Sequence, residues 1–161
     1  MNTKFLTKAS LIAAIYIILV LIQIPMGSLA FGPVQLRLAE GLTLLPFIET
    51  AAIPGLFIGC LISNIILSSY SSFGLVDIIG GSLVTLIAAY LTSKMPNKLM
   101  AALPPIILNG LIVSIWVSYF TKVPYLFTVL GIAAGEIASI VIFGYVMLSA
   151  YEKTKVYLEK R

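Results

Sequence analysis

The sequence contains no histidine and only one cysteine, Cys60. Without histidine, the chain lacks the commonest general base of enzymes and the commonest metal ligand. A single cysteine forms no disulfide within the chain and supplies no cysteine-based metal site. We therefore expect neither a metal nor a cofactor, and we interpret Cys60 as a small core residue.

Charged residues are also scarce, at 10% of the chain, whereas 60% of the residues are hydrophobic. The mean hydropathy is +1.11, and this composition predicts a multi-pass protein of the cell membrane. The net charge of +4 is small, and its placement indicates orientation in the membrane rather than binding to nucleic acid. The sequence contains no phosphate-binding P-loop motif, so any ATP hydrolysis is expected in partner subunits.

Apolar segments divide the whole chain. At about 20 residues per spanning helix, they predict an all-α bundle of six transmembrane helices that forms a single domain, 1–161. The first segment lacks a small-residue cleavage site, so we interpret it as a spanning helix rather than a signal peptide. The second is the shortest and is the one expected to fall short of a full span. The segments are 9–25, 36–49, 51–68, 75–93, 100–120 and 124–150, and the end of the chain, "YEKTKVYLEKR", is expected to continue the last helix into the headgroup region.

Lysine and arginine indicate how this bundle is oriented. With the N-terminus inside, eight of them fall on the inner side, and the outer loops hold only Lys122. Because cytoplasmic loops carry an excess of basic residues, both termini are predicted to be cytoplasmic. The eight inner residues are Lys4, Lys8, Lys94, Lys98, Lys153, Lys155, Lys160 and Arg161.

Polar side chains inside the apolar segments are the candidate functional residues. An ionised side chain at the centre of a membrane costs about 2.5–3.5 kcal/mol, so such residues usually face a cavity or one another. In the predicted orientation they share the outer half of the membrane and its midplane, which favours a substrate-binding cavity that opens outward. The candidates are Arg37, Glu40, Asn64, Asp77, Asn109, Trp116 and Glu136.

Most of these residues also have a structural interpretation. Arg37 and Glu40 stand three positions apart and can neutralise each other on one helix. Asp77 can cap the fourth helix, and Asn64 and Asn109 can form hydrogen bonds between helices. The residues alone leave these alternatives open.

Glu136 has the fewest structural explanations. No basic residue in its own helix lies within reach, and the small residues of "AAGEIAS" allow another group to approach closely. Trp116 can equally be a packing or interfacial aromatic, and Glu49 is interpreted as a solvated turn residue.

Five motifs are spread along the chain: "PVQLRLAEGLTLLPF", "AIPGLFIGCLISN", "GLVDIIGGSLVTLIAAYLTSKM", "LPPIILNGLIV" and "GIAAGE". In order and spacing they resemble the queuosine-precursor (QueT) transporter family, whose members are substrate-binding S components of energy-coupling factor (ECF) transporters. The resemblance extends from about residue 5 to residue 150. One small departure is Gly41, where alanine is expected after the glutamate.

The resemblance implies a six-helix S-component fold that binds a vitamin-like small molecule from outside. It also implies a transmembrane coupling protein and two cytosolic ATPases as partners. In S components, small residues on the first helix contact the coupling protein, so the resemblance assigns this contact to Ala9 and Ala13. Ser10 and Ala14 repeat the same spacing, and packing within the monomer is the alternative for such a pattern.

The implied substrate is a 7-deazaguanine precursor of queuosine, with the aminomethyl form preQ1 favoured. Its adjacent N–H donors suit a carboxylate, its carbonyl suits an amide, its ring stacks on an aromatic face, and its ammonium group requires a second acid. This chemistry assigns Glu136 and Glu40 as the acids, Asn109 as the amide and Trp116 as the stacking wall. Arg37 is expected to orient Glu40 and keep it ionised.

Two other functions remain as alternatives. One is an S component for another vitamin, such as a flavin or a pteridine. The other is an intramembrane enzyme in which two carboxylates do acid and base work. No nucleophile or metal-ligand cluster accompanies the carboxylates, so we expect the chain not to be an enzyme.

Overall fold

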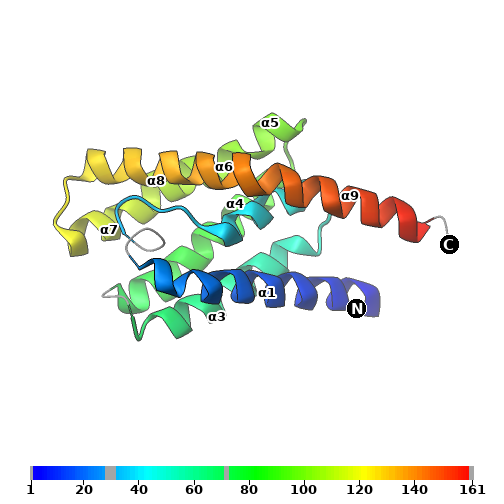
Figure 1. The fold of residues 1–161 in the computed structure, drawn as a ribbon, viewed down its shortest axis with the longest axis horizontal. Helices are drawn as coiled ribbons and strands as arrows, with labels where there is room; N and C mark the ends of the chain where they lie inside the picture. Colours follow the sequence, from blue (N-terminus) through cyan, green and yellow to red (C-terminus); the bar gives the residue numbers. More distant parts are fainter. Residues whose placement is uncertain (1, 28–31, 71–72, 160–161) are drawn as a thin grey trace.

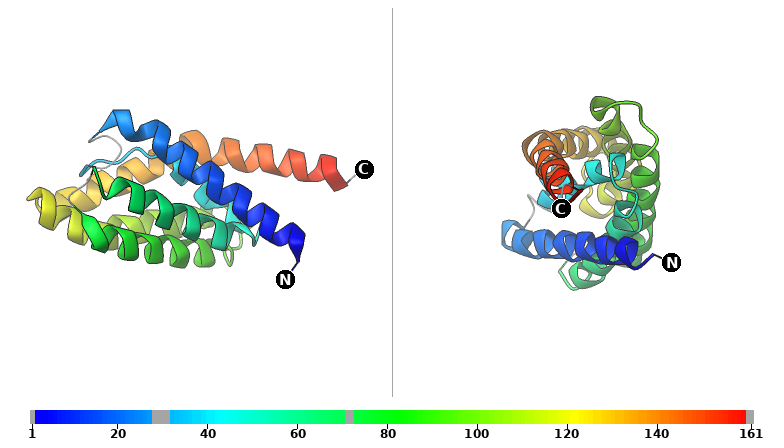
Figure 2. Two further views of the ribbon diagram at one scale, coloured as in Figure 1. Left: turned by 90° about the horizontal axis from the view of Figure 1, so that it is seen from below. Right: turned by 90° about the vertical axis from the view of Figure 1, so that its right-hand side faces the viewer.

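The structure, a computed structural model, describes residues 2–27, 32–70 and 73–159. Its helices run roughly along the long axis of the molecule, and α1 begins at the same end of the bundle at which α9 ends (Figures 1 and 2). Each predicted segment is helical, and several are divided into shorter elements. These are α1 Thr3–Gln23, η1 Ile24–Met26, η2 Leu38–Phe47, α3 Ala52–Leu67, η3 Val76–Gly81, α4 Ser82–Thr92, α5 Lys98–Ala101, α6 Leu103–Leu108, η4 Asn109–Val113, α7 Ser114–Thr121, α8 Tyr125–Ser139, η5 Ile140–Gly144 and α9 Tyr145–Glu159.

The first helix begins earlier than predicted, and the last helix extends past its apolar segment. α1 begins at Thr3 rather than at residue 9, because Asn2 caps it and accepts a hydrogen bond from the N–H of Lys4 at 3.1 Å. The last helix continues beyond its apolar segment to Glu159, as the end of the sequence predicted. Hydropathy misses the first extension because lysine and threonine interrupt its apolar residues.

Length and apolarity divide the bundle into two sets of helices. Three helices are long and apolar enough to cross a membrane, and three more are apolar but shorter, which fits a multi-pass membrane protein. The long ones are Thr3–Met26, Lys98–Thr121 and Tyr125–Lys155; the shorter ones are Leu38–Phe47, Ala52–Leu67 and Val76–Thr92.

The shortest helix, η2, is a 3-10 helix of ten residues. At a rise of about 2 Å per residue it extends about 20 Å, which is less than the hydrocarbon thickness of about 30 Å. Eight of its residues, from Ala39 to Pro46, are buried. Viewed along the bundle, it lies inside the ring formed by the other helices (Figure 2, right). Because backbone groups exposed to lipid have no hydrogen-bond partners, only this enclosure allows so short an element.

α1 packs closely against α3 at two glycines. A Cβ added to Gly55 would lie 2.8 Å from the carbonyl oxygen of Ala9, and one added to Gly59 would lie 2.8 Å from the Cβ of Tyr16. Ala9 and Ala13 are each only 6% exposed as a result. Both alanines therefore pack within the monomer, the alternative that the sequence left open.

Three π-helical turns interrupt the second half of the chain: η3, η4 and η5. Asp77 lies in η3 and Asn109 begins η4, while η5 follows four residues after Glu136. A π turn widens the helix locally and is frequent at functional sites. Each turn thus adjoins one of the polar candidates.

Glu49 joins three parts of the chain at the end of the bundle where α1 begins. It is only 9% exposed, so its interpretation as a solvated turn residue is wrong. Its Oε2 contacts the Nζ of Lys8 in α1 and accepts a hydrogen bond from the hydroxyl of Tyr151 in α9 at 2.8 Å. Its Oε1 accepts a hydrogen bond from the N–H of Ala51 at 3.2 Å.

Acid is expected to weaken this junction. Burial alone would raise the pKa of Glu49, but the hydrogen bonds from Lys8, Tyr151 and the Ala51 N–H outweigh burial and hold the pKa below its ordinary value. Such a carboxylate stabilises the fold above its unfolded pKa, and this stability is lost as the pH falls through the folded pKa. Between about pH 6 and pH 2, the thermal midpoint in detergent should therefore fall further for the wild type than for Glu49→Gln. Identical pH profiles for the two proteins would contradict this.

Candidate functional site

The segment before η2 is extended rather than helical, and it lies along a groove in α8. Two glycines of α8 form the floor of this groove. A Cβ added to Gly131 would lie 2.4 Å from the carbonyl oxygen of Pro33, and one added to Gly135 would lie 1.7 Å from the carbonyl oxygen of Gln35. The backbone of this segment is therefore the group that approaches the small residues around Glu136.

Two side chains satisfy the backbone of the extended segment. Gln23, which is 2% exposed, donates to the carbonyl oxygen of Leu36 at 2.7 Å and accepts from the N–H of Leu38 at 2.6 Å. The hydroxyl of Ser139 accepts from the N–H of Arg37 at 2.9 Å. Because non-helical backbone at membrane depth requires partners within the protein, these contacts allow Arg37 to stand outside a helix.

Arg37 and Glu40 form the ion pair that their spacing predicted, but they do not do so on one helix. The Nη1 of Arg37 lies 3.4 Å from the Oε1 of Glu40. Arg37 precedes η2 with extended backbone, at φ −116° and ψ 117°. The hydroxyl of Tyr16 donates to the same Oε1 at 3.3 Å and accepts from the Nη2 of Arg37 at 3.4 Å.

Glu40 and Glu136, which we call the acid pair, are the most deeply buried charged candidates. They are 1% and 3% exposed, and both belong to the region where α8 packs against the segment that leads to η2. Asn109 donates to the Oε1 of Glu136 at 2.7 Å, which joins α8 to η4. The Oε2 of Glu40 is buried and has no hydrogen-bond partner among the described residues.

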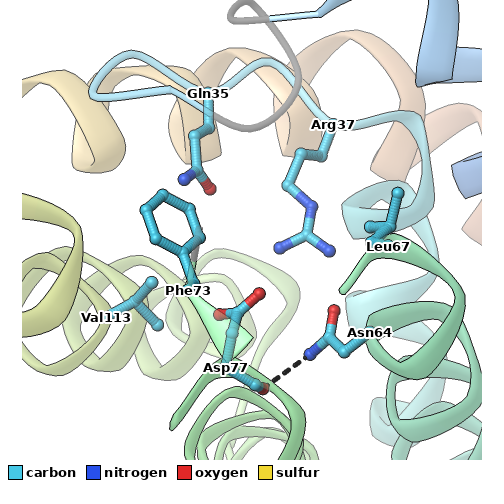
Figure 3. Close-up of a pocket in the computed structure, with 7 residues that line it drawn as sticks. All are labelled: Gln35, Arg37, Asn64, Leu67, Phe73, Asp77 and Val113. Atoms are coloured by element: carbon cyan, nitrogen blue, oxygen red, sulfur yellow. Dashed lines mark hydrogen bonds between the residues drawn. The ribbon is translucent and has the colours of Figure 1, made fainter. Parts of the chain in front are cut away.

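A polar cavity lies next to Arg37, the residue that pairs with Glu40. Its volume is about 20 Å³, room for about one water molecule. The guanidinium of Arg37, the carboxylate of Asp77 and the side-chain oxygen of Asn64 point toward one another across it (Figure 3). The cavity is lined by Gln35, Arg37, Asn64, Leu67, Phe73, Asp77 and Val113.

Asp77 and Trp116 hold each other at the edge of this cavity. The Nε1 of Trp116 donates to the Oδ1 of Asp77 at 3.1 Å, and the Nδ2 of Asn64 donates to the backbone oxygen of Asp77 at 2.8 Å. Trp116 is 8% exposed, packs in the same hydrophobic cluster as Phe73, and is not among the residues that line the cavity. Phe73 is the aromatic residue that faces the cavity (Figure 3).

The structure connects the other six sequence candidates to Arg37 or to each other. Glu40 pairs with Arg37 and Asn109 with Glu136, whereas Asn64 and Asp77 line the cavity with Arg37, and Trp116 bonds to Asp77. Sequence reasoning missed five residues of the site: Tyr16, Gln23, Gln35, Phe73 and Ser139. Gln23 had a usable signal as an amide in an apolar run, and Ser139 completes a row of small residues at every fourth position with Gly131 and Gly135.

The electrostatics of the site favour a cationic ligand. Three carboxyl groups, those of Glu40, Asp77 and Glu136, surround one guanidinium, that of Arg37. Carboxylates in a medium of low dielectric are stabilised by an added positive charge or by hydrogen-bond donors. Among the described residues no cluster of histidine, cysteine, aspartate and glutamate is arranged to hold a metal ion. The site is therefore suited to binding an organic cation with N–H donors.

Comparison with known proteins extends over nearly the whole chain. Residues 6–153 match the sequence model of a family described as QueT transporter. The chain is 27% identical over 160 residues to the queuosine precursor transporter QueT of Lactococcus lactis subsp. cremoris (strain MG1363), and the similarity covers 91% of each chain. No solved structure matches the chain. The matched range includes every residue of the site described above.

Proposed function

Because the chain belongs to the QueT transporter family, we propose that it is the substrate-binding S component of an ECF-type importer. Its substrate is a 7-deazaguanine precursor of queuosine, with the aminomethyl form preQ1 favoured. As a member of a transporter family, the chain is not an enzyme, and its apolar helices agree with a multi-pass membrane location. ATP hydrolysis takes place in two cytosolic partner subunits, which act through a transmembrane coupling protein.

The acid pair is the observation that carries this proposal. Two carboxyl groups are buried, one paired with Arg37 at the edge of the polar cavity and one with Asn109, and the Oε2 of Glu40 has no partner among the described residues. The pyrimidine edge of a deazaguanine presents adjacent N–H donors that a carboxylate accepts in pairs, and the aminomethyl group supplies a cation. Glu136 and Glu40 are the acids of the site, and Asn109 holds Glu136 in place.

The cavity side of the site supplies the remaining contacts. Asn64 and Asp77 offer polar groups there, and Phe73 offers an aromatic face. We assign stacking on the substrate ring to Phe73 and a supporting role to Trp116, which orients Asp77. A space of about 20 Å³ is too small for a bicyclic base, so the cavity widens when substrate enters.

Membrane orientation and partner contact complete the proposal. Both termini are cytoplasmic, in accordance with the excess of lysine and arginine on the predicted inner side. The single transmembrane domain opens its site outward. Ala9 and Ala13 are buried against α3, which argues against direct partner contact there. We place the contact with the coupling protein on the exposed side of α1, where Ser10 and Ala14 have the same small-residue spacing.

A binding titration tests the substrate. Purified protein in detergent is titrated with 7-aminomethyl-7-deazaguanine and, separately, with riboflavin and a pteridine, and the heat of binding is recorded. We expect saturable binding of the deazaguanine only. Tight binding of riboflavin or the pteridine without any response to the deazaguanine would reject the queuosine assignment and favour an S component for another vitamin.

Glu136→Gln tests the acid pair. The substitution keeps the size of the side chain and removes a charge-assisted hydrogen bond, which contributes about 1.5–3 kcal/mol. We expect the dissociation constant for 7-aminomethyl-7-deazaguanine to rise about tenfold to a hundredfold, with little change in the thermal midpoint. The matched control is Glu152→Gln, which removes an exposed acid that pairs with Lys98 away from the site. Equal affinity of Glu136→Gln and the wild type would remove Glu136 from the substrate contacts.

A further inference from the structure

The two oxygens of the Glu40 carboxyl group are in unequal surroundings. Its Oε1 accepts the hydroxyl of Tyr16 at 3.3 Å and lies 3.4 Å from the Nη1 of Arg37. Its Oε2 is buried and has no donor among the described residues. Leaving a buried acceptor without a donor costs about 1–3 kcal/mol, and more for a charged group. A donor to this oxygen is therefore missing if every nearby carboxyl group is ionised.

The neighbouring carboxyl group of Glu136 can provide that donor. Glu136 lies in the part of α8 that packs against the segment leading to Glu40, between Gly135, which touches Gln35, and Ser139, which accepts the N–H of Arg37. Asn109 already donates to the Oε1 of Glu136 at 2.7 Å. The Oε2 of Glu136 remains to carry a proton. Two carboxyl groups that share a buried site do not both ionise, because the like charges repel each other at low dielectric.

The charged and titratable groups around the acid pair do not balance its negative charge. Arg37 is the cation that faces it, and its single contact with Glu40 is long at 3.4 Å. The carboxylate of Asp77 in η3 faces the same guanidinium across the polar cavity (Figure 3). Tyr16 from α1 and Cys60 from α3 are the other titratable groups nearby, and both are buried. One guanidinium thus faces three carboxyl groups, which leaves an excess negative charge in a buried site.

We propose that the empty site holds one proton within the acid pair, donated from Glu136 to the Oε2 of Glu40, and that the cationic group of the substrate replaces this proton. The incoming ammonium N–H donates to the carboxylates, and the proton leaves for bulk water, so the net charge of the occupied site is unchanged. The identity of the cation in this exchange rests on the proposed function. The presence of the proton in the empty site rests on the unpaired Oε2 of Glu40 and on the burial of both carboxyl groups.

This exchange links substrate binding to pH. The proton competes with the cation for the same two carboxyl groups, so affinity rises with pH while the empty pair stays protonated. In that range one proton is released for each ligand bound, and the dissociation constant falls about tenfold for each pH unit. At a pH high enough to ionise the empty pair, both proton release and this slope disappear.

Infrared spectroscopy of the ligand-free protein tests whether the empty site holds this proton, independently of substrate binding. Wild-type protein in detergent should show a carbonyl stretch from a protonated carboxyl group that is buried. Glu136→Gln should lack this band, because its amide donates to the Oε2 of Glu40 in place of the proton. Glu152→Gln, altered at an exposed acid, should keep the band. A wild-type spectrum without such a band, or a band that survives in Glu136→Gln, would overturn the proposal.

Calorimetry with 7-aminomethyl-7-deazaguanine tests the exchange. Titrations at one pH in phosphate and in Tris, which differ in protonation enthalpy, should report about one proton released per ligand for the wild type and none for Glu136→Gln at saturating ligand. Tight binding by the wild type without proton release would overturn the exchange. No binding at all would reject the proposed substrate and the exchange with it, and the infrared band would still decide whether the empty pair holds a proton.

Discussion

Gly135→Ala should abolish substrate binding and lower the thermal stability of the protein. The added Cβ would lie 1.7 Å from the carbonyl oxygen of Gln35, which is backbone and has no rotamer to change. The extended segment must therefore leave the groove in α8, and Arg37 loses its hydrogen bond to Ser139. Overpacking of this kind costs about 1–3 kcal/mol or more, whereas helix propensity alone would favour alanine by about 1 kcal/mol.

Gly80→Ala is the matched control for this substitution. Its added Cβ would lie 3.5 Å from the ring of Trp116, an ordinary van der Waals contact. We expect Gly80→Ala to bind 7-aminomethyl-7-deazaguanine with wild-type affinity and to melt at or above the wild-type temperature. Unchanged affinity and melting temperature in Gly135→Ala would show that the extended segment does not depend on the groove.

Arg37→Met should be the most destabilising single substitution among the charged residues of the site. It removes the cation beside Glu40, which is 1% exposed, and leaves an uncompensated carboxylate in the core. Breaking a buried ion pair in this way costs about 3–5 kcal/mol. We expect a large fall in the thermal midpoint measured in detergent, together with loss of ligand binding.

The double variant Arg37→Met/Glu40→Gln separates stability from binding. Removing both charges abolishes the uncompensated carboxylate, so most of the lost stability should return. Binding should stay weak, because the site has lost one of its two acids. Recovery of both stability and affinity would assign Glu40 a purely structural role. A double variant no more stable than Arg37→Met would show that the cost does not come from the Glu40 charge and arises instead from packing of the arginine side chain or from the carboxyl groups of Asp77 and Glu136.

The sequence by itself determined the helical membrane bundle and the residues that carry its chemistry. Hydropathy depends on the composition of each segment and not on its neighbours, so every apolar segment was recognisable before packing was known. A charged side chain within such a segment stands out wherever it packs, which is why Glu40, Asp77 and Glu136 were identified. The ion pair between Arg37 and Glu40 was predictable because it depends only on a spacing of three residues.

Helix type and helix ends depended on contacts that the apolar pattern does not encode. Residues 36 and 37 were predicted as helical because they continue an apolar run. They are extended because their backbone groups bond to Gln23 and Ser139, which are distant in sequence. Glu49 looked like a solvated turn residue because Lys8 and Tyr151, the partners that enclose it, lie 41 and 102 positions away.

Only the tertiary structure decided which side of each helix faces the protein. The pairs Ala9 with Ala13 and Ser10 with Ala14 have the same spacing on α1. The first pair is buried because Gly55 and Gly59 of α3 leave room for it, and that choice depends on the shape of both helices. Trp116 likewise became a support for Asp77 because packing between helices covers its ring. Composition and local spacing therefore determined which residues are polar and buried, and contacts between distant segments decided what each of them touches.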